Sequence, residues 1–269
     1  MSRYDRMFER CQAERRIALG GFLILGYPSR AAMPALLDAL VEGGADMIEL
    51  GIPFSDPVAD GPVIQHAGER AIARGIGIDA ILGWVREFRI DDAHTPVVLM
   101  GYLNPIEIRG STRFAREARA AGIDGVLVVD VPVEESATLQ PLLDAGIEQV
   151  FLVAPTTTDA RLAAIRARAR GFMYYVSFAG ITGASHLDVD AVRTKVAHVR
   201  QGGDIPVAVG FGVHDAATAS AIAECADAVV IGSALVSRLA EARDGAHACR
   251  IAHEFLGPIR AALDGAQAG

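Results

Sequence analysis

The sequence predicts an α/β fold: a single (β/α)₈ TIM barrel that spans residues 1–269 and carries an extra helix at its N-terminus. Three observations support this. The chain has 269 residues, of which 51% are hydrophobic, and this suits one such barrel. Short apolar runs alternate eight times with longer helical patterns. No linker interrupts the alternation, whereas a doubly wound open sheet, the alternative fold, usually has fewer strands.

The predicted strands are short and rich in β-branched or other apolar residues. Several are continuous apolar runs, such as Val97-Val98-Leu99-Met100, which is typical of parallel strands buried on both faces. We expect strands at Gly21–Leu25, Met47–Leu50, Val97–Met100, Gly125–Val129, Gln149–Val153, Met173–Val176, Val207–Val209 and Ala228–Ile231.

The intervening segments have helical patterns, and several are followed by a glycine that can end a helix. The charged N-terminal stretch Met1–Arg16 is predicted to be the extra helix. Further helices are expected at Ala31–Glu42, Ser111–Ala121, Glu134–Asp144, Asp159–Ala169 and Asp215–Glu224.

Charge and cysteine content exclude several classes of protein. Lys and Arg number 25 against 33 Asp and Glu, a net charge of −8 that argues against nucleic-acid binding. The three cysteines form no CxxC pair and the seven histidines show no HxH or HExxH spacing, so no metal site is expected. No apolar run is long enough for a membrane span. We expect a cytoplasmic protein with reduced thiols.

Glu49 is the first candidate catalytic residue, because it interrupts the apolar strand Met47–Leu50 with a carboxylate. In a barrel, catalytic groups lie at the carboxyl ends of the strands. Burial disfavours the charged form of a carboxylate and raises its pKa, which suits a general acid. The alternative is a structural glutamate that pairs with a buried arginine or with backbone donors.

The segment Gly51–Pro62 is longer than a strand-to-helix turn requires and contains a second candidate carboxylate, Asp60. Asp60 could also be the N-cap of the next helix, with Pro62 near its first position; from position alone this reading is favoured. Asp56 is either an Asx-turn residue or a partner contact. Because long structured loops are often lids, we expect the loops Phe54–Asp60 and Phe178–Leu187 to cover the site.

Glycine-rich turns follow the last three predicted strands and indicate a phosphate site. They are Gly180-Ile181-Thr182-Gly183, Gly210-Phe211-Gly212-Val213 and Gly232-Ser233-Ala234. Glycines let backbone N–H groups approach an anion, and Ser233 adds a hydroxyl donor. The loops after strands seven and eight commonly bind phosphate in this fold. Ordinary turn chemistry is the alternative.

Apolar residues on or near the strands are core by default, although some could line a flat pocket of aromatic size at the mouth. Of the successive Tyr174 and Tyr175, one must face the barrel interior. The other residues of this kind are Phe22, Met100, Leu127, Val129, Val153 and Phe211.

Six motifs, in order along the chain, resemble those of the tryptophan synthase alpha family. The longest is Glu49-Leu-Gly-Ile-Pro-Phe-Ser-Asp-Pro-Val-Ala-Asp-Gly-Pro-Val-Ile-Gln65. The others are Leu99–Pro105, Val128–Glu135, Tyr174–Gly183, and the pair Gly210-Phe-Gly212 and Ile231-Gly-Ser233. The resemblance implies a lyase that cleaves indole-3-glycerol phosphate to indole and glyceraldehyde 3-phosphate in tryptophan biosynthesis.

The resemblance also implies site residues. Glu49 would protonate the ring carbon that bears the side chain, with acceptance of the side-chain hydroxyl proton as a further role open to it. Asp60 would accept the indole N–H, and Tyr174 would adjoin Glu49 and the substrate. Indole would pack on Phe22, Leu127, Val129, Val153 and Phe211, and phosphate would bind at Gly183, Gly212, Gly232 and Ser233, with Thr182 a further substrate-binding residue.

The same resemblance implies a beta subunit as partner, in an α₂β₂ complex, contacted by Asp56, Pro57, Asn104 and Pro132. No cofactor is implied for this chain, since pyridoxal phosphate would belong to the partner. The sequence departs from the family pattern at Gly21, Ile24, Tyr27, Gly101 and Ala179, which bears on loop closure and coupling to the partner. Two alternatives stay open: a free-standing lyase, and a weakly catalytic allosteric subunit of a beta-type enzyme.

Overall fold

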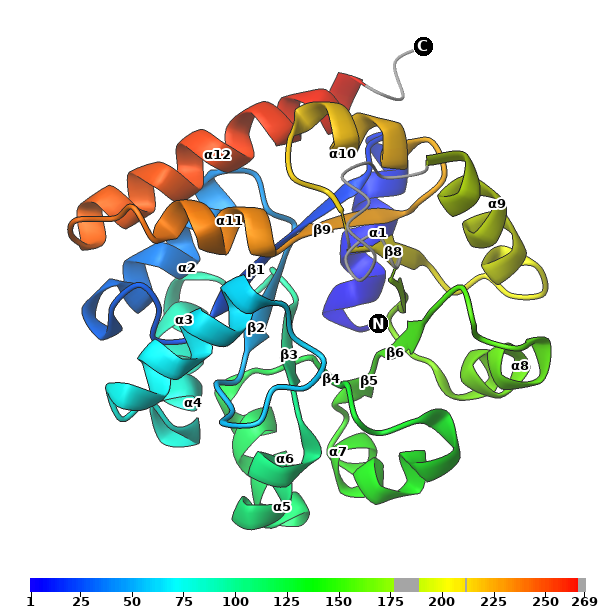
Figure 1. The fold of residues 1–269 in the computed structure, drawn as a ribbon. Helices are drawn as coiled ribbons and strands as arrows, with labels where there is room; N and C mark the ends of the chain where they lie inside the picture. Colours follow the sequence, from blue (N-terminus) through cyan, green and yellow to red (C-terminus); the bar gives the residue numbers. More distant parts are fainter. Residues whose placement is uncertain (177–188, 211, 266–269) are drawn as a thin grey trace.

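In the computed structural model, residues 1–176, 189–210 and 212–265 are described, and these form a parallel β-barrel surrounded by helices (Figure 1). The predicted TIM barrel is therefore confirmed. The strands are β1 (Ala18–Ile24), β2 (Met47–Gly51), β3 (Val97–Gly101), β4 (Gly125–Val128), β5 (Glu148–Gln149), β6 (Phe151–Val153), β7 (Met173–Tyr175), β8 (Val207–Val209) and β9 (Ala228–Ile231).

The sheet order is β5-β4-β3-β2-β1-β9-β8-β7-β6, with every pairing parallel. The predicted fifth strand, Gln149–Val153, is thus two short strands separated by Val150. Val150 donates its backbone N–H to the carbonyl of Val126 at 2.9 Å, which carries the pairing with β4 past the break. The two ends of the sheet are therefore joined through a single residue, and the ring of strands is almost complete.

The first strand begins at Ala18, three residues earlier than predicted, because the buried run Ala18-Leu19-Gly20 pairs with β9. The helices are α1 (Arg3–Ala13), η1 (Arg30–Ala32), α2 (Met33–Glu42), α3 (Pro62–Ala73), α4 (Ile78–Asp91), α5 (Leu103–Arg109), α6 (Ser111–Ala121), η2 (Val133–Leu139), α7 (Gln140–Asp144), α8 (Asp159–Arg168), α9 (Val189–Arg200), α10 (Ala216–Ala223), α11 (Ser233–Leu239) and α12 (Gly245–Gly265).

The helix predictions are confirmed with one exception. The segment Glu134–Asp144 is a 3₁₀ helix followed by the short helix α7, rather than one continuous helix. Pro141 lies in the first turn of α7, where its missing N–H costs nothing, and it would break a longer helix. None of the helices in the described part of the chain is long and apolar enough to cross a membrane.

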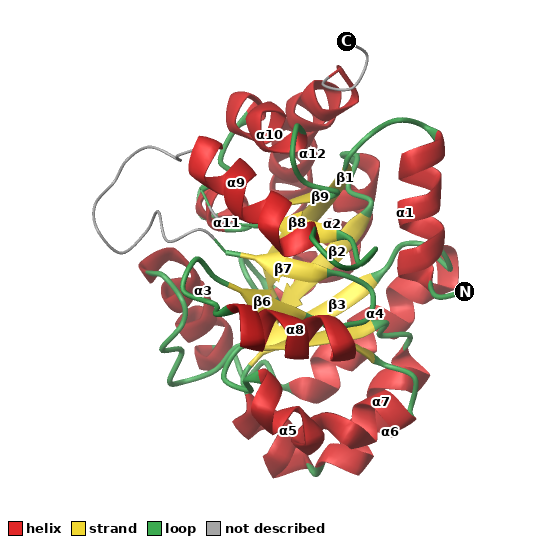
Figure 2. Cartoon of the chain, turned by 90° about the vertical axis from the view of Figure 1, so that its right-hand side faces the viewer, coloured by secondary structure: helices red, strands yellow, loops and turns green. Residues whose placement is uncertain are grey.

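Helix α1 lies at the amino-terminal end of the strands, opposite the strand ends that lead into the long loops (Figure 2). Its buried Tyr4 packs edge-on against Phe172, with ring centroids 5.5 Å apart, and Phe172 packs against Tyr174 at 6.3 Å. An aromatic column therefore leads from α1 to the middle of the barrel. The extra N-terminal helix that the sequence predicts is part of the core.

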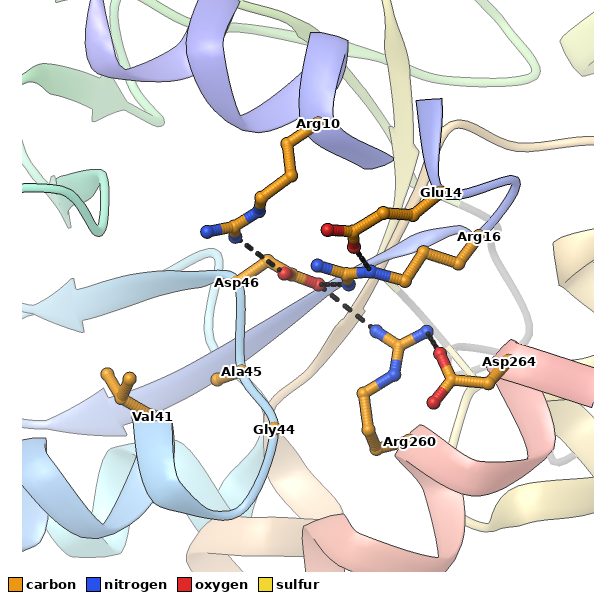
Figure 3. A pocket seen from close by; sticks show the side chains of 9 residues that line it. All are labelled: Arg10, Glu14, Arg16, Val41, Gly44, Ala45, Asp46, Arg260 and Asp264. Atoms are coloured by element: carbon orange, nitrogen blue, oxygen red, sulfur yellow. Dashed lines mark hydrogen bonds and ion pairs between the residues drawn. The ribbon is translucent and has the colours of Figure 1, made fainter. Parts of the chain in front are cut away.

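An ion cluster at the same end of the barrel is centred on Asp46, which is 5% exposed (Figure 3). Its carboxylate accepts from Arg10 at 3.0 Å, from Arg16 at 2.7 Å and from Arg260 at 3.1 Å. It also accepts from the backbone N–H of Leu19 at 3.0 Å. These contacts join α1, β1, the residue before β2, and α12.

Candidate active site

Glu49 lies on β2 between two apolar strands, in register with Phe22 on β1 and Val98 on β3. Its side chain is 2% exposed, and burial raises the pKa of the carboxyl to about 8, an effect that the Tyr174 hydroxyl opposes. Neither carboxylate oxygen accepts a well-formed hydrogen bond from any described residue. The structural alternative, a glutamate paired with a buried arginine, therefore has no support in this environment.

Tyr174 is the member of the tyrosine pair that faces the interior. It lies on β7 in register with Leu152 and Ala208, and its buried hydroxyl adjoins Glu49. A methyl group built on Gly210 would lie 1.9 Å from the Tyr174 hydroxyl oxygen. Gly210 is therefore required for the Tyr174 ring to occupy this place.

Asp60 is not the N-cap of α3, the reading that position alone favoured. Gly61 is the N-cap and Pro62 begins the helix, as Pro often does because it has no N–H to leave unpaired. The Asp60 carboxyl is mostly buried, and this burial raises its pKa to about 6, while a hydrogen bond from Tyr102 acts in the opposite direction. Its backbone carbonyl accepts from Gln65 at 2.8 Å, which fixes the end of the loop.

Phe22 lies on β1, and its ring approaches the ends of the two strands that flank β1, which are β2 and β9. Methyl groups built on Gly51 and Gly232 would lie 2.9 Å and 3.3 Å from atoms of its ring. Gly51 follows Glu49 by two positions on β2, and Gly232 follows β9. The structure thus brings the Phe22 ring between the Glu49 strand and the predicted phosphate loop.

The remaining predicted pocket residues divide between the two faces of the sheet. Leu127 lies near the carboxyl end of β4, where it is in register with Met100, and the half-buried Val129 follows this strand. Val153 is in register with Tyr175, and therefore lies on the face opposite Tyr174. The residue of this strand that shares the Tyr174 face is Leu152, so the structure does not bring Val153 to the interior with the others.

Gly212 and Gly232 follow the adjacent strands β8 and β9, and each lies three residues beyond a member of the pair formed by Val209 and Val229. Gly212 has a φ of 79°, a backbone conformation that glycine adopts without strain. Ser233 begins α11 directly after Gly232. Four further predicted features, Thr182, Gly183, Phe211 and the loop Phe178–Leu187 with its Ala179, lie outside the described residues.

The predicted partner residues lie on the loops and short helices that follow β2, β3 and β4. Asp56, Asn104 and Pro132 are exposed and Pro57 is half-buried. Two large apolar side chains close to them in sequence are also exposed, Val58 at 87% and Ile108 at 84%. Sequence reasoning did not single out either of these residues, because an isolated exposed apolar residue has no sequence signature.

Four departures from the family pattern lie in the described residues: Gly21 and Ile24 on β1, Tyr27 shortly after it, and Gly101 at the end of β3. A methyl group on Gly21 would lie 3.3 Å from Leu40, so this residue faces helix α2 from the middle of β1. A methyl group built on Gly51 would lie 2.5 Å from the Ile24 side chain, and Tyr27 is 4% exposed. A side chain on Gly101 would meet Ile52 at 3.2 Å.

Tyr102 is a polar residue at the site that sequence reasoning did not single out. It is 3% exposed, and its hydroxyl accepts from the backbone N–H of Ala59 at 3.0 Å. In the sequence it is marked only by its position directly after the buried strand β3, and the apolar residues around it have similar positions. No group of three or more His, Cys, Asp or Glu in the described ranges could hold a metal ion.

Two carboxyl groups with different pKa values are thus present near the carboxyl ends of β2. Near pH 7, Glu49 carries its proton while Asp60 is ionised. One can therefore donate a proton while the other accepts a hydrogen bond or stabilises positive charge. Such a pair suits the protonation of an electron-rich ring next to a nitrogen.

The chain was compared with known proteins. The family model described as tryptophan synthase alpha chain matches residues 8–262. The tryptophan synthase alpha chain of Xylella fastidiosa (strain 9a5c) is 51% identical over 265 residues, 98% of this chain and 99% of the relative. That of Burkholderia pseudomallei (strain 1106a) is 51% identical over 267 residues, 99% and 98% of the two chains.

Solved structures agree with the sequence comparison. The crystal structure of tryptophan synthase subunit alpha from Legionella pneumophila has a TM-score of 0.91 and 38% identity, covering 98% of this chain and 99% of that chain. A Mycobacterium tuberculosis tryptophan synthase structure has a TM-score of 0.88 and 38% identity, covering 100% and 99%. The chain therefore belongs to the tryptophan synthase alpha chain family, the lyases of tryptophan biosynthesis that cleave indole-3-glycerol phosphate.

Proposed function

We propose that Glu49, Asp60 and Tyr174 perform the retro-aldol cleavage of indole-3-glycerol phosphate in this chain. The observation that carries this assignment is the buried Glu49, whose pKa burial raises to about 8, which has no basic partner among the described residues and adjoins Tyr174 inside the barrel. A carboxylic acid held neutral at neutral pH is available as a proton donor to a substrate carbon.

The proton movements balance without an external acid or base. Glu49 gives its proton to the ring carbon that bears the glycerol side chain, and Asp60 accepts a hydrogen bond from the indole N–H as positive charge develops there. The Glu49 carboxylate then takes the proton of the adjacent side-chain hydroxyl. The carbon–carbon bond breaks, its electron pair restores the aromatic ring, and an aldehyde leaves as glyceraldehyde 3-phosphate.

Substrate binding is assigned to two groups of residues. The apolar group packs the indole ring and comprises Phe22, Leu127, Val129, Val153 and Phe211, with Leu152 the better candidate than Val153 by strand register. The polar group surrounds the phosphate and comprises Thr182, Gly183, Gly212, Gly232 and Ser233. The neighbouring positions of Gly212 and Gly232 support this group, since backbone N–H groups at strand ends can bind phosphate.

The partner of this chain is a tryptophan synthase beta subunit, in an α₂β₂ complex, which contacts Asp56, Pro57, Asn104 and Pro132. The exposure of Val58 and Ile108 near these residues supports an apolar contact in the same region. Pyridoxal phosphate belongs to that partner, because the chain's only lysine, Lys195, is exposed on α9. The three free thiols are consistent with a cytoplasmic protein.

The substitution Glu49→Gln tests the assignment. It keeps the shape of the side chain but removes the proton donor, so kcat for indole release should fall by about 10²–10⁴-fold. Glu148→Gln, a half-buried glutamate at the other end of the barrel, is the matched control and should keep parental activity. Parental activity in Glu49→Gln, with its circular dichroism unchanged, would remove Glu49 from the mechanism.

The three functional alternatives are separated by one assay of indole release. The isolated chain is measured first, and purified beta subunit is then added to saturation. A rise in kcat supports the partner-dependent subunit, because contact at the mouth completes the site. High activity that the beta subunit does not change indicates a free-standing lyase. Negligible activity in both states, with stimulation of the beta reaction, indicates an allosteric subunit.

A further inference from the structure

Tyr102 is held firmly in place by its backbone. It follows the last residue of β3 and is the N-cap of α5, with extended backbone (φ −113°, ψ 158°). Leu103 begins α5, and its backbone N–H donates a hydrogen bond of 2.9 Å to the side chain of Asp130, which follows β4. The neighbouring strand thus supplies the cap that the tyrosine side chain cannot provide.

The Tyr102 ring is packed as well as anchored. The Phe54 ring lies against it, with centroids 5.0 Å apart and an angle of 31° between the planes. Phe54 belongs to the loop that also contains Asp60, and the tyrosine is 43 residues further along the chain from Ala59. Tyr102 therefore fastens this loop at two points, one apolar and one polar.

The hydroxyl of Tyr102 has a defined hydrogen-bonding arrangement. Its oxygen accepts the backbone N–H of Ala59 at 3.0 Å, so its single proton remains for another acceptor. The adjacent residue is Asp60, and a hydrogen bond from Tyr102 acts to lower the pKa of its carboxyl, against the effect of burial. A phenol that receives an amide proton and donates to a carboxylate ties both the backbone and the side chain of this segment.

We propose that Tyr102 is a positioning residue for Asp60, and that its hydroxyl sets the direction and the ionisation of this carboxylate in the lyase reaction. The proposal rests on the role assigned to Asp60 above. Tyr102 itself is not required to touch the substrate. It acts by closing the loop at Ala59 and by donating to the ionised form of Asp60.

The alternative is that Tyr102 only fills space beneath the loop. A phenylalanine would then serve equally well, because the ring supplies the packing against Phe54. The two explanations differ at one oxygen atom. Among the described residues, two effects act on the pKa of Asp60: its burial raises the pKa and the hydrogen bond from Tyr102 lowers it. The pKa of Tyr102 is itself raised, chiefly by burial, and Asp130 adds to that rise.

The test is Tyr102→Phe, assayed for indole release as a function of pH beside Tyr175→Phe. Tyr175 is also buried but faces away from the site, so its variant is the matched control. In Tyr102→Phe we expect kcat/KM to fall about 10- to 100-fold, the range for a hydrogen bond to a charged group. We also expect the acid limb of the profile to move to higher pH, because the ionised carboxylate loses a donor.

A double substitution separates this inference from the assignment of Asp60. If Tyr102 acts through Asp60, then adding Tyr102→Phe to Asp60→Asn should change kcat/KM by less than about threefold. Full additivity of the two effects would overturn the proposal, as would a parental pH profile in Tyr102→Phe. An Asp60→Asn variant with parental activity would instead reject the role of Asp60 itself.

A direct titration does not depend on activity. The Asp60 carboxyl carbon, followed by NMR in the full chain with and without Tyr102→Phe, should titrate at higher pH in the variant. Asp130→Asn should leave that titration nearly unchanged, because Asp130 bonds the backbone of Leu103 and is not among the groups that shift the Asp60 pKa. Identical Asp60 titrations in the parent and in Tyr102→Phe would overturn the proposal.

Discussion

The two carboxyl groups of the site differ in pKa because their surroundings differ. Glu49 is surrounded by the apolar side chains of neighbouring strands, so burial dominates and its proton is retained to about pH 8. Asp60 lies on a loop and is less deeply buried, so its pKa rises only to about 6. A neutral acid and an ionised base can then coexist near pH 7.

This separation predicts a bell-shaped pH dependence of kcat/KM. Activity should rise as Asp60 ionises near pH 6 and fall as Glu49 loses its proton near pH 8. Steady-state assays of the isolated chain from pH 5 to 9 measure both limbs. An acid limb that persists in Asp60→Asn would come from the substrate phosphate, whose second pKa is about 6. A flat profile across this range would contradict the assignment.

At the level of single residues, the sequence predicts what depends on local pattern. Glu49 is recognisable because one carboxylate interrupts an apolar strand. The N-cap reading of Asp60 was wrong because the preference for Asp at that position is general, and Gly61 takes the cap instead. The contact of Tyr102 could not be predicted from the sequence, because its partner Ala59 is distant along the chain and only folding brings the two together. Val153 and Leu152 are distinguished only by the register with Tyr174.

The contact between β7 and the end of β8 shows how strands position the acid. Tyr174 can stand beside Glu49 only because Gly210 has no side chain. Substituting Gly210→Ala should push the tyrosine ring aside and lower kcat by about 10²-fold, the cost of misplacing a group by about 1 Å.

Gly203→Ala is the control for that prediction, because a methyl group there meets no atom within 4 Å. Both variants add one methyl group to a glycine near β8: Gly203 precedes this strand and Gly210 follows it. Indole-release kinetics, with near-ultraviolet circular dichroism of the tyrosines, would measure the effect. Equal kcat in the two variants would mean that the Tyr174 position is unimportant.

Strand and helix positions were predictable because apolar periodicity reflects burial. Helix α6 was placed at Ser111–Ala121, and Gly122, with a φ of 93°, ends it as the pattern implied. The interruption at Val150 was not predictable, because Gln149–Val153 is a continuous strand-like run. Whether its residues pair with β4 or β7 depends on how the ring closes, which no local pattern encodes.

Over the whole molecule, chemistry and anchoring lie at opposite ends of the barrel. The candidate catalytic residues lie on the strands and toward their carboxyl ends, whereas the Asp46 cluster joins α1 and α12 at the amino ends (Figure 3). Such a division lets loops at the mouth vary while the other end maintains the closed sheet.

The Asp46 cluster should therefore contribute strongly to stability. Asp46→Asn removes the buried charge that three arginines share, and leaves Arg16 and Arg260 with the more exposed carboxylates of Glu14 and Asp264 as their ion-pair partners. We expect the free energy of unfolding to fall by roughly 2–4 kcal/mol, measured by urea denaturation. Asp190→Asn, which breaks the exposed pair with Arg193, should change it by less than about 0.5 kcal/mol. Equal effects would contradict the central role of Asp46.

The pairing of β1 with β9 has a consequence for synthesis on the ribosome. The first strand leaves the exit tunnel early, yet one of its edges pairs only with residues 228–231, and Arg260 reaches Asp46 later still. Until then, the nascent chain presents an apolar strand edge that could pair with another polypeptide. The cell must therefore keep that edge shielded from the time β1 emerges until residues 228–231 have followed it, each time the protein is made.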